Sequence, residues 1–163
     1  IKNAELMISS DFLVLNGDVI FSDLDLDKLI YAHKKSDSLA TIVLAKSRTP
    51  TRFGAVELDE QNKVISFVEK PRKPHSGETW VNAGVYVFRN SIFTKIAKAK
   101  RTSLELDIIP KLMREGTIFG YKHEGYWADV GTPEDYLRVQ KDLLTGVFKP
   151  PGVITTEGAF TEH

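Results

Sequence analysis

The sequence contains no cysteine. Without thiols the chain can have no disulfide framework, no thiolate nucleophile and no thiolate metal site. Its charges also cancel, because 22 lysines and arginines stand against 22 aspartates and glutamates. A chain without net charge produces no overall field that would attract nucleic acid or an anionic membrane. These absences exclude whole classes of site and give no support for a nucleic-acid or membrane partner.

Long apolar runs are missing too. No stretch has the length that a membrane-spanning helix needs, and Ile1–Glu5 does not resemble the apolar core of a signal peptide. We therefore expect a cytoplasmic protein. Apolar residues make up 42% of the chain, which is typical of a globular domain with one core. The chain opens without a methionine and closes on a segment with no finishing element, so we expect a piece of a longer protein.

The most informative stretch is Asp11–Asp18, with the sequence DFLVLNGD. Its continuous apolar run predicts a strand that is buried on both faces, as in a parallel sheet. Asp18 then follows the carboxyl end of this strand, where ligands bind in open α/β sheets. A carboxylate at that place can hold a hard cation against a phosphate. The alternative is that Asn16–Asp18 is only a turn and that Asp18 caps the next segment.

The remaining pattern predicts an α/β domain. After Asp18 we expect a polar loop over residues 20–25, and then a helix with Asp25 as its N-cap. A strand follows this helix, and this βαβ order predicts that the first two strands run parallel. Pro110 should kink or split the helix that contains it. Thr132 is the expected N-cap of the last helix, with Pro133 as its first residue. Strands are predicted at residues 12–15, 38–45, 54–59, 63–68, 80–88, 118–121 and 125–129, and helices at 25–36, 90–99, 103–115 and 132–144.

Two aspartates occupy the same kind of position. Asp129 ends the strand before Gly131, as Asp18 ends the first strand. If both strands belong to one sheet, their carboxylates can converge at its edge. Two carboxylates together with substrate phosphates are a usual ligand set for Mg²⁺. The alternative for Asp129 is that it only accepts hydrogen bonds from the start of the following helix.

Further polar residues stand at the ends and on the faces of strands. Lys70 follows the second strand of the hairpin and can neutralise a phosphate, while Glu69 can accept hydrogen bonds from sugar hydroxyls. The alternative is an exposed charged pair in a turn before Pro71. The strand at 80–88 is predicted to alternate with a period of two, which places Asn82 and Gly84 on the face of Trp80, Tyr86 and Phe88 and the valines and Ala83 on the other face. A glycine there indicates the close approach of either a ligand or a packing neighbour.

Other motifs carry less. Asp23, Asp25 and Asp27 have the acid-x-acid spacing of metal-dependent glycosyltransferases. Asp25 and Asp27 are better explained as an N-cap and a first-turn acid. The histidines share no metal-ligand spacing, and the Gly-x-Ser-x-Gly motif of serine hydrolases is absent from the sequence.

Taken in order, six segments resemble the sugar-1-phosphate nucleotidylyltransferases, most of all the mannose-1-phosphate guanylyltransferases and glucose-1-phosphate thymidylyltransferases. The segments are FLVLNGD (12–18), FGAVELD (53–59), FVEKP (67–71), VNAGVYVF (81–88), SLELDIIPKL (103–112) and GYWADVGTPEDYLRVQ (125–140). The resemblance implies a Rossmann-like mixed α/β sheet of the nucleotide-diphospho-sugar transferase type.

The resemblance also implies a reaction. A sugar 1-phosphate oxygen attacks the α-phosphate of a nucleoside triphosphate in line, and an NDP-sugar and pyrophosphate form with the help of Mg²⁺. By the same resemblance Asp18 and Asp129 are the metal ligands and, with Lys70, the catalytic residues. The sugar 1-phosphate would be bound by Gly54, Glu69, Lys70, Asn82 and Gly84, with Glu69 on the hydroxyls, Lys70 on the phosphate and Gly84 leaving room for the sugar.

One part of the family pattern is missing. The sequence has no glycine-rich loop of the form Gly-Gly-x-Gly-Thr-Arg, which cradles the triphosphate with backbone N–H groups. We therefore expect residues 1–146 to be the C-terminal portion of the catalytic domain without its N-terminal nucleotide-binding segment. Residues 147–163 would be a linker or tail, the start of a truncated β-helix region.

On this interpretation the chain alone is inactive. Its partners are a sugar 1-phosphate, a nucleoside triphosphate and either the missing N-terminal half or a second copy of the protein. The base and the sugar are left open. So are a non-catalytic regulatory or binding module of the same fold and a metal-dependent glycosyltransferase.

Overall fold

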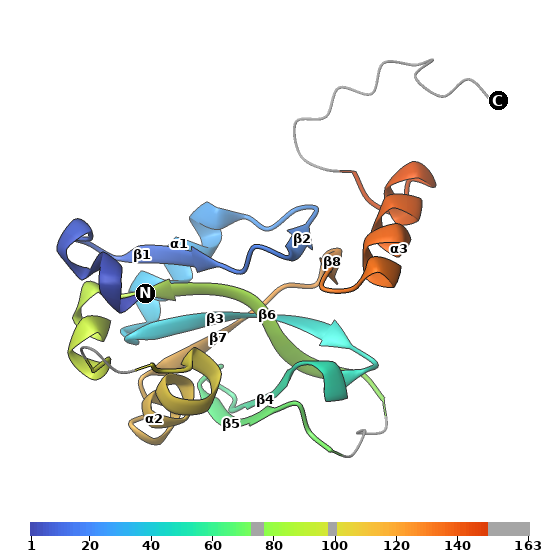
Figure 1. Ribbon diagram of the computed structural model, residues 1–163. Helices are drawn as coiled ribbons and strands as arrows, with labels where there is room; N and C mark the ends of the chain where they lie inside the picture. The colour runs from blue at the N-terminus through green and yellow to red at the C-terminus, as the bar shows by residue number, and fades with distance from the viewer. Residues whose placement is uncertain (73–76, 98–100, 150–163) are drawn as a thin grey trace.

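A mixed sheet forms the centre of the computed structural model, which describes residues 1–72, 77–97 and 101–149 (Figure 1). β3 and β7 run parallel, whereas the other neighbours in this sheet are antiparallel. The predicted Rossmann-like mixed α/β sheet is therefore confirmed. The strands follow the order β5 (Val64–Glu69), β4 (Gly54–Leu58), β6 (Thr79–Phe88), β3 (Ala40–Ser47) and β7 (Ile118–Lys122), and β1 (Phe12–Leu15) also pairs with β6.

The long strand β6 organises this sheet. β3 runs along one side of it, and β1 and β4 share the other side. The prediction that the first strand is buried on both faces is wrong. Within the described residues β1 pairs with β6 alone, and its side chains are half-buried or exposed. β1 and β3 do run in the same direction, as predicted, because both are antiparallel to β6, but β6 lies between them.

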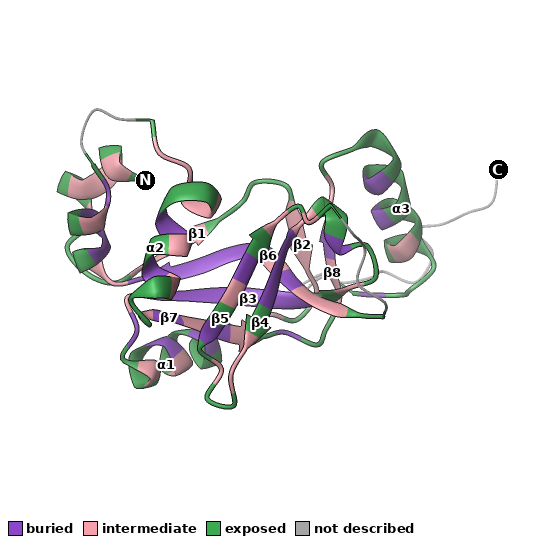
Figure 2. Cartoon of the chain, turned by 90° about the horizontal axis from the view of Figure 1, so that it is seen from below, coloured by how far each residue is buried: buried purple, intermediate pink, exposed green. Residues whose placement is uncertain are grey.

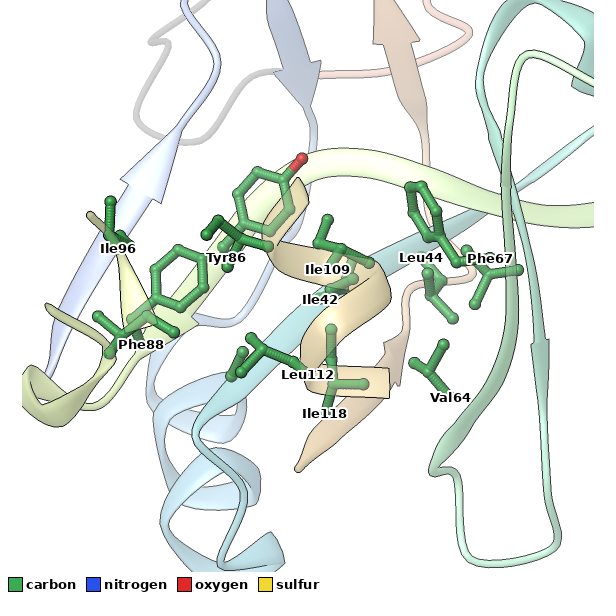
Figure 3. Close-up of a cluster of buried hydrophobic side chains, with 14 of the residues drawn as sticks. Ile42, Leu44, Val64, Phe67, Tyr86, Phe88, Ile96, Ile109, Leu112 and Ile118 are labelled. Atoms are coloured by element: carbon green, nitrogen blue, oxygen red, sulfur yellow. The ribbon is translucent and has the colours of Figure 1, made fainter. Parts of the chain in front are cut away.

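Alternating side chains give the sheet an apolar layer on each face, and the buried residues concentrate along β6 and β3 (Figure 2). On one face β3 and β6 pack against α2 (Ile109–Arg114), and on the other against Leu29 of α1 (Leu26–Ser36). The predicted period of two along β6 is therefore confirmed. The first cluster includes Ile42, Leu44, Tyr86, Phe88, Ile109 and Leu112 (Figure 3), and the second includes Val43, Ala45, Ala83, Val85 and Val87.

Local signals start the helices where they were expected. The Asp25 side chain accepts a hydrogen bond from the Lys28 N–H at 2.9 Å and caps α1. Thr132 caps α3 (Pro133–Leu144) in the same way. Proline has no N–H to donate, and the predicted helix at 103–115 is accordingly split at Pro110 into a π-helical turn, Leu104–Ile108, and α2.

Shorter pieces complete the described chain. The predicted helix at 90–99 is a 3₁₀ helix, Asn90–Lys95, and residues 98–100 lie outside the described residues. Further 3₁₀ helices are Lys2–Met7 and Pro50–Arg52. Phe148 stacks on Tyr126 with their ring centroids 4.0 Å apart, while the rest of the predicted tail, from residue 150 on, lies outside the described residues. No helix in the described residues is long and apolar enough to cross a membrane.

A two-stranded antiparallel ribbon stands apart from the main sheet in the described chain. It pairs β2 (Val19–Phe21) with β8 (Trp127–Asp129), and Val19 lies opposite Asp129. The prediction of a polar loop over residues 20–25 missed β2, because three residues are too few to show an alternating pattern. The predicted route by which Asp18 and Asp129 meet, across the edge of one shared sheet, is also wrong. The ribbon brings them together instead.

His33 gives the fold an expected pH dependence. Its ring is fully buried, Nδ1 lies 2.8 Å from Thr41 Oγ1, and Nε2 has no hydrogen-bond partner among the described residues. Burial lowers the pKa of His33 below its usual value of 6.5. The unfolded chain therefore binds a proton more readily, and stability falls as the pH drops below the unfolded pKa. We expect a loss on the order of 1 kcal/mol between pH 7 and pH 5.

Urea unfolding of the wild type and of His33→Asn at several pH values checks this expectation. Asparagine places an amide where Nδ1 of the imidazole lies, so it can still bond Thr41 but does not titrate, and the pH dependence over this range should flatten in the variant. An equally steep loss in both proteins would assign the effect to other groups.

Candidate active site

A cavity of about 610 Å³ opens where the β2–β8 ribbon meets the main sheet. β4, β5 and β6 contribute residues from one side, and the turn after β1 and the segment after β8 contribute from the other. The structure thus brings together side chains that are far apart in the sequence. All the residues that the resemblance assigns to the site line this cavity, namely Asp18, Gly54, Glu69, Lys70, Asn82, Gly84 and Asp129. Their roles stay predictions.

The two aspartates flank Gly131. The Val130 N–H donates to the Asp18 carbonyl oxygen at 2.8 Å, which fixes the turn before β2 against the end of β8. A Cβ built on Gly131 would lie 3.1 Å from Asp129 Oδ1 and 3.8 Å from Asp18 Oδ2. The missing side chain therefore leaves both carboxylates facing a common space. Asp129 Oδ1 also accepts the Gly131 N–H at 3.2 Å, in the turn just before the Thr132 N-cap of α3, so Asp129 bonds the approach to the helix and not the helix itself.

This donor set suits Mg²⁺. Among the described residues there is no group of three or more histidines, cysteines, aspartates or glutamates that would enclose an ion on its own. Mg²⁺ is commonly held by one or two carboxylates together with substrate phosphates and water. An aspartate pair on an open cavity fits that pattern, with Asp18 and Asp129 as the residues that would hold the ion.

Glu69 and Lys70 form the opposite wall, at the end of β5. Burial, and after it the charge of Glu105, raises the pKa of Glu69 above its usual value. The Glu69 carboxylate lies close to Gly54 of β4. A Cβ built on Gly54 would lie only 2.9 Å from Glu69 Oε2 and 2.6 Å from Phe67 Cζ. Lys70 is exposed and has φ +46°, and its N–H donates to the Phe53 carbonyl oxygen at 3.0 Å. Gly54 thus gives the Glu69 carboxylate the space it occupies.

Asn82 is held rigidly beside them. Its Nδ2 donates to Tyr86 Oη at 2.7 Å, and its Oδ1 accepts the Gly84 N–H at 3.1 Å. Tyr86 is fully buried, and burial raises the pKa of its hydroxyl. Gly84 has φ +78°, and a Cβ there would lie 2.9 Å from Asn16 Nδ2. The space that Gly84 leaves is therefore filled by Asn16, so its predicted role in making room for a sugar would be indirect.

Sequence reasoning missed several residues of the cavity wall: Asn16, Arg52, Glu105, Trp127 and Thr132. Asn16 lies in the same motif as Asp18, so the assignment of Asp18 to the site was a signal that could have identified Asn16 as well. Glu105 and Trp127 sit inside predicted elements and looked like ordinary helix and strand residues. Arg52 carried a weak signal, an arginine in the loop just before Gly54.

Arg52 ties the loop before β4 to the first turn of α3. Its Nη1 donates to Asp135 Oδ1 at 3.2 Å, and its Nη2 donates to Asp135 Oδ2. Nη2 also lies 3.7 Å from Asp129 Oδ1. The bonds from Arg52, Thr132 and Arg138 hold the pKa of Asp135 well below its usual range. Beside this pair, Phe53 packs edge-on against Trp127, whose Nε1 donates to the Ala83 carbonyl oxygen at 3.0 Å.

The mixed sheet and this cavity define an α/β protein whose site combines paired aspartates, a lysine and fixed polar groups. The chain belongs to the nucleotidyl transferase family, whose model it matches over residues 1–146.

Named relatives agree with this assignment. The chain is 36% identical over 153 residues to a mannose-1-phosphate guanylyltransferase of Mycobacterium tuberculosis, covering 93% of this chain and 42% of that protein. It is 36% identical over 151 residues to the bifunctional protein GlmU of Methanococcus maripaludis, covering 90% of this chain and 35% of that protein. This sequence thus spans less than half the length of these relatives.

A solved structure shares the fold. The crystal structure of a candidate glucose-1-phosphate thymidylyltransferase from Bacillus anthracis, in complex with sucrose, superposes with a TM-score of 0.75 at 25% identity. The match covers 86% of this chain and 57% of that chain. The predicted resemblance to sugar-1-phosphate nucleotidylyltransferases is therefore confirmed at the level of family and fold.

Proposed function

We propose that the protein carrying this chain transfers a nucleotidyl group from a nucleoside triphosphate to a sugar 1-phosphate. The products are an NDP-sugar and pyrophosphate, and the reaction depends on Mg²⁺. The observation that carries the proposal is the convergence of Asp18, Asp129 and Lys70 on one cavity. Membership of the nucleotidyl transferase family and the names of the relatives support it.

The phosphate groups would meet the charged side of the cavity. Lys70 would neutralise the sugar phosphate, so that one of its oxygens can approach the negatively charged α-phosphate in line. Asp18 and Asp129 would hold Mg²⁺ against the phosphate oxygens. When bound, the ion supplies the neutralisation of charge that develops on those oxygens during transfer. The protein's own part is mainly to hold the reactants in line.

The sugar would lie against Glu69 and Asn82. The Glu69 carboxylate lines the cavity and can accept bonds from two hydroxyls. Asn82 retains one N–H of its amide beyond the bond to Tyr86, and its orientation is fixed by Tyr86 and Gly84. Polar groups that are held before the ligand arrives bind it with less loss of entropy. This wall of the cavity therefore suits a hydroxyl-rich ligand with a phosphate at one end.

A non-catalytic binding module of the same fold is the second candidate. Such a module would need a ligand cavity but would have no need of two aspartates and a lysine arranged around it. The retention of all three residues favours the enzyme.

The test is a transfer assay with the purified full-length protein. The first substrates are mannose 1-phosphate with GTP and then glucose 1-phosphate with dTTP, and both pyrophosphate and the NDP-sugar are measured. We expect Mg²⁺-dependent turnover with at least one pair, and none from the isolated 163-residue chain. Binding of a sugar 1-phosphate without turnover of any tested pair would favour the regulatory module.

Glu69→Gln should weaken sugar binding more than it slows transfer. The amide removes the charge that strengthens hydrogen bonds from sugar hydroxyls, which are worth about 1.5–3 kcal/mol each when one partner is charged. We expect the KM for the sugar 1-phosphate to rise by about tenfold or more, with a smaller change in kcat. Steady-state kinetics over a range of sugar 1-phosphate concentrations measures both.

The matched control is Glu57→Gln, which makes the same change at an exposed position of the same hairpin. Its KM should stay at the wild-type value. A KM for Glu69→Gln that also stays there would remove Glu69 from the sugar site.

A further inference from the structure

The guanidinium of Arg52 lies between the two sides of the candidate site. Arg52 ends the 3₁₀ helix Pro50–Arg52, directly before Phe53 and Gly54 on the side of the cavity that also carries Glu69. Its Nη2 reaches across to Asp129 Oδ1 on the ribbon, at 3.7 Å. A cation at this distance is close enough to act on whatever Asp129 binds.

Asp135 fixes the guanidinium in this place. Asp135 is only 6% exposed, and its carboxylate accepts the fork of Arg52 on both oxygens. Thr132 Oγ1 donates to Asp135 Oδ2 at 2.8 Å, and the Asp135 N–H donates back to the same hydroxyl at 3.1 Å. The Arg52 guanidinium is therefore bound on two nitrogens by a carboxylate whose own position Thr132 restrains, which leaves the guanidinium little freedom to move. Arg52 therefore faces Asp129 as a fixed charge.

The surroundings of the Arg52–Asp129 pair strengthen the electrostatic interaction between the two side chains. The Asp129 side chain is 23% exposed and the Arg52 side chain is 43% exposed, so the pair is partly shielded from water. Arg52 also lies over the Phe53 ring, 5.4 Å from its centroid, and Phe53 packs on Trp127 of the ribbon. The aromatic contacts hold the loop of Arg52 against β8, which carries Asp129.

We propose that Arg52 is the resident counter-ion of Asp129. It offsets the repulsion between the Asp18 and Asp129 carboxylates, and it opposes the binding of a free divalent cation at Asp129. This inference rests on the proposed metal role of Asp129. Its consequence is that the ion binds well only with the phosphates of the nucleotide, whose negative charge outweighs the guanidinium. Arg52 is thus a positioning residue that acts through Asp129.

The test is a titration with Mn²⁺ alone, without nucleotide or sugar, on the full-length protein. Free Mn²⁺ is measured by electron paramagnetic resonance. A cation bound to Asp129 would lie roughly 5–6 Å from the guanidinium, where Coulomb's law in a water-like medium gives about a tenfold effect on affinity. We expect Arg52→Gln to bind Mn²⁺ about tenfold more tightly than the wild type. Arg52→Lys keeps the charge but loses the two-pronged bond to Asp135, so its Mn²⁺ affinity should lie between those of the wild type and Arg52→Gln.

Further variants separate the proposal from its competitors. Arg138→Gln removes another arginine of Asp135, one that reaches Asp135 and Asp142, and it should change the Mn²⁺ affinity by less than about threefold because it lies farther from Asp129. Arg52→Gln combined with Asp135→Asn removes the uncompensated carboxylate, which both protects folding and prevents Asp135 from becoming a new ligand. The reference for this double variant is Asp135→Asn alone, since both lack the charge of Asp135. The double variant should bind Mn²⁺ about tenfold more tightly than Asp135→Asn.

Unchanged Mn²⁺ binding by Arg52→Gln overturns the proposal, and so does weaker binding if urea unfolding shows the variant to be as stable as the wild type. Tighter binding cannot come from damage to the fold, because damage loosens a metal site. Equal Mn²⁺ binding by the double variant and by Asp135→Asn overturns it too, since the tighter binding of Arg52→Gln would then come from Asp135. A protein that binds Mn²⁺ in this pattern but transfers no nucleotide would contradict the proposed function and leave this inference standing.

Discussion

Asp129→Asn should reduce nucleotidyl transfer by about 1,000-fold or more, because it removes one of the two carboxylates that would hold Mg²⁺ and such a metal contributes several kcal/mol to the transition state. The change is nearly isosteric. The new amide oxygen can still accept the Gly131 N–H, so the turn before α3 should keep its structure. The loss should appear in kcat, and raising the Mg²⁺ concentration should recover part of it. Transfer assays over a range of Mg²⁺ concentrations measure both effects.

Asp18→Asn should behave in the same way, since both carboxylates flank Gly131. The control is Asp27→Asn, the same change at an exposed first-turn position of α1, outside the residues that line the cavity. It should keep full activity. Full activity in Asp129→Asn would overturn the metal assignment, and an equally large loss in Asp27→Asn would show that such a loss does not identify a metal ligand.

The sequence was sufficient for features that depend on local chemistry. A side-chain oxygen three residues before a free N–H made Asp25 and Thr132 recognisable as N-caps, and both serve as such. Alternation along residues 80–88 correctly separated the two faces of β6, because successive side chains of a strand point to opposite faces of the sheet. The ordered motifs around Asp18 and Lys70 led to the family, which the match over residues 1–146 confirms.

Features that depend on distant pairing were not predictable in this way. The apolar run of β1 looked like a central strand, but its one partner in the described chain, β6, comes about seventy residues later. The ribbon of β2 and β8 is too short for its pattern to be read, although it is what brings Asp18 and Asp129 together. The hydrogen bond between Arg52 and Asp135 joins a loop to a helix terminus, and nothing in the sequence around either residue indicates that the two will pair.

Lys70 offers the sharpest separation of function from stability. It has φ +46°, although a residue before proline is normally extended and a left-handed conformation costs a non-glycine residue about 1–2 kcal/mol. Strain of this kind persists where the surrounding structure imposes it, often at functional sites. Lys70→Gly should relieve this strain. The gain should offset the conformational entropy that glycine loses on folding, up to about 1 kcal/mol, so the free energy of unfolding should hardly change. Transfer should fall by about 100-fold or more, because the charge facing the sugar phosphate is lost.

Asn62→Gly supplies the control. Asn62 has φ +60° in the turn between β4 and β5, away from the cavity lining, and its hydrogen bonds to Asp59 and Gly120 are made by the backbone. Glycine there should also leave the free energy of unfolding nearly unchanged, and activity should stay at the wild-type value. Urea unfolding and transfer assays on the two variants therefore separate the effect of losing the Lys70 charge from the effect of changing the backbone to glycine. If Lys70→Gly instead kept full activity, the strain at Lys70 would serve only the hairpin's connection to Pro71, and the sugar phosphate would have to be neutralised by another residue of the cavity.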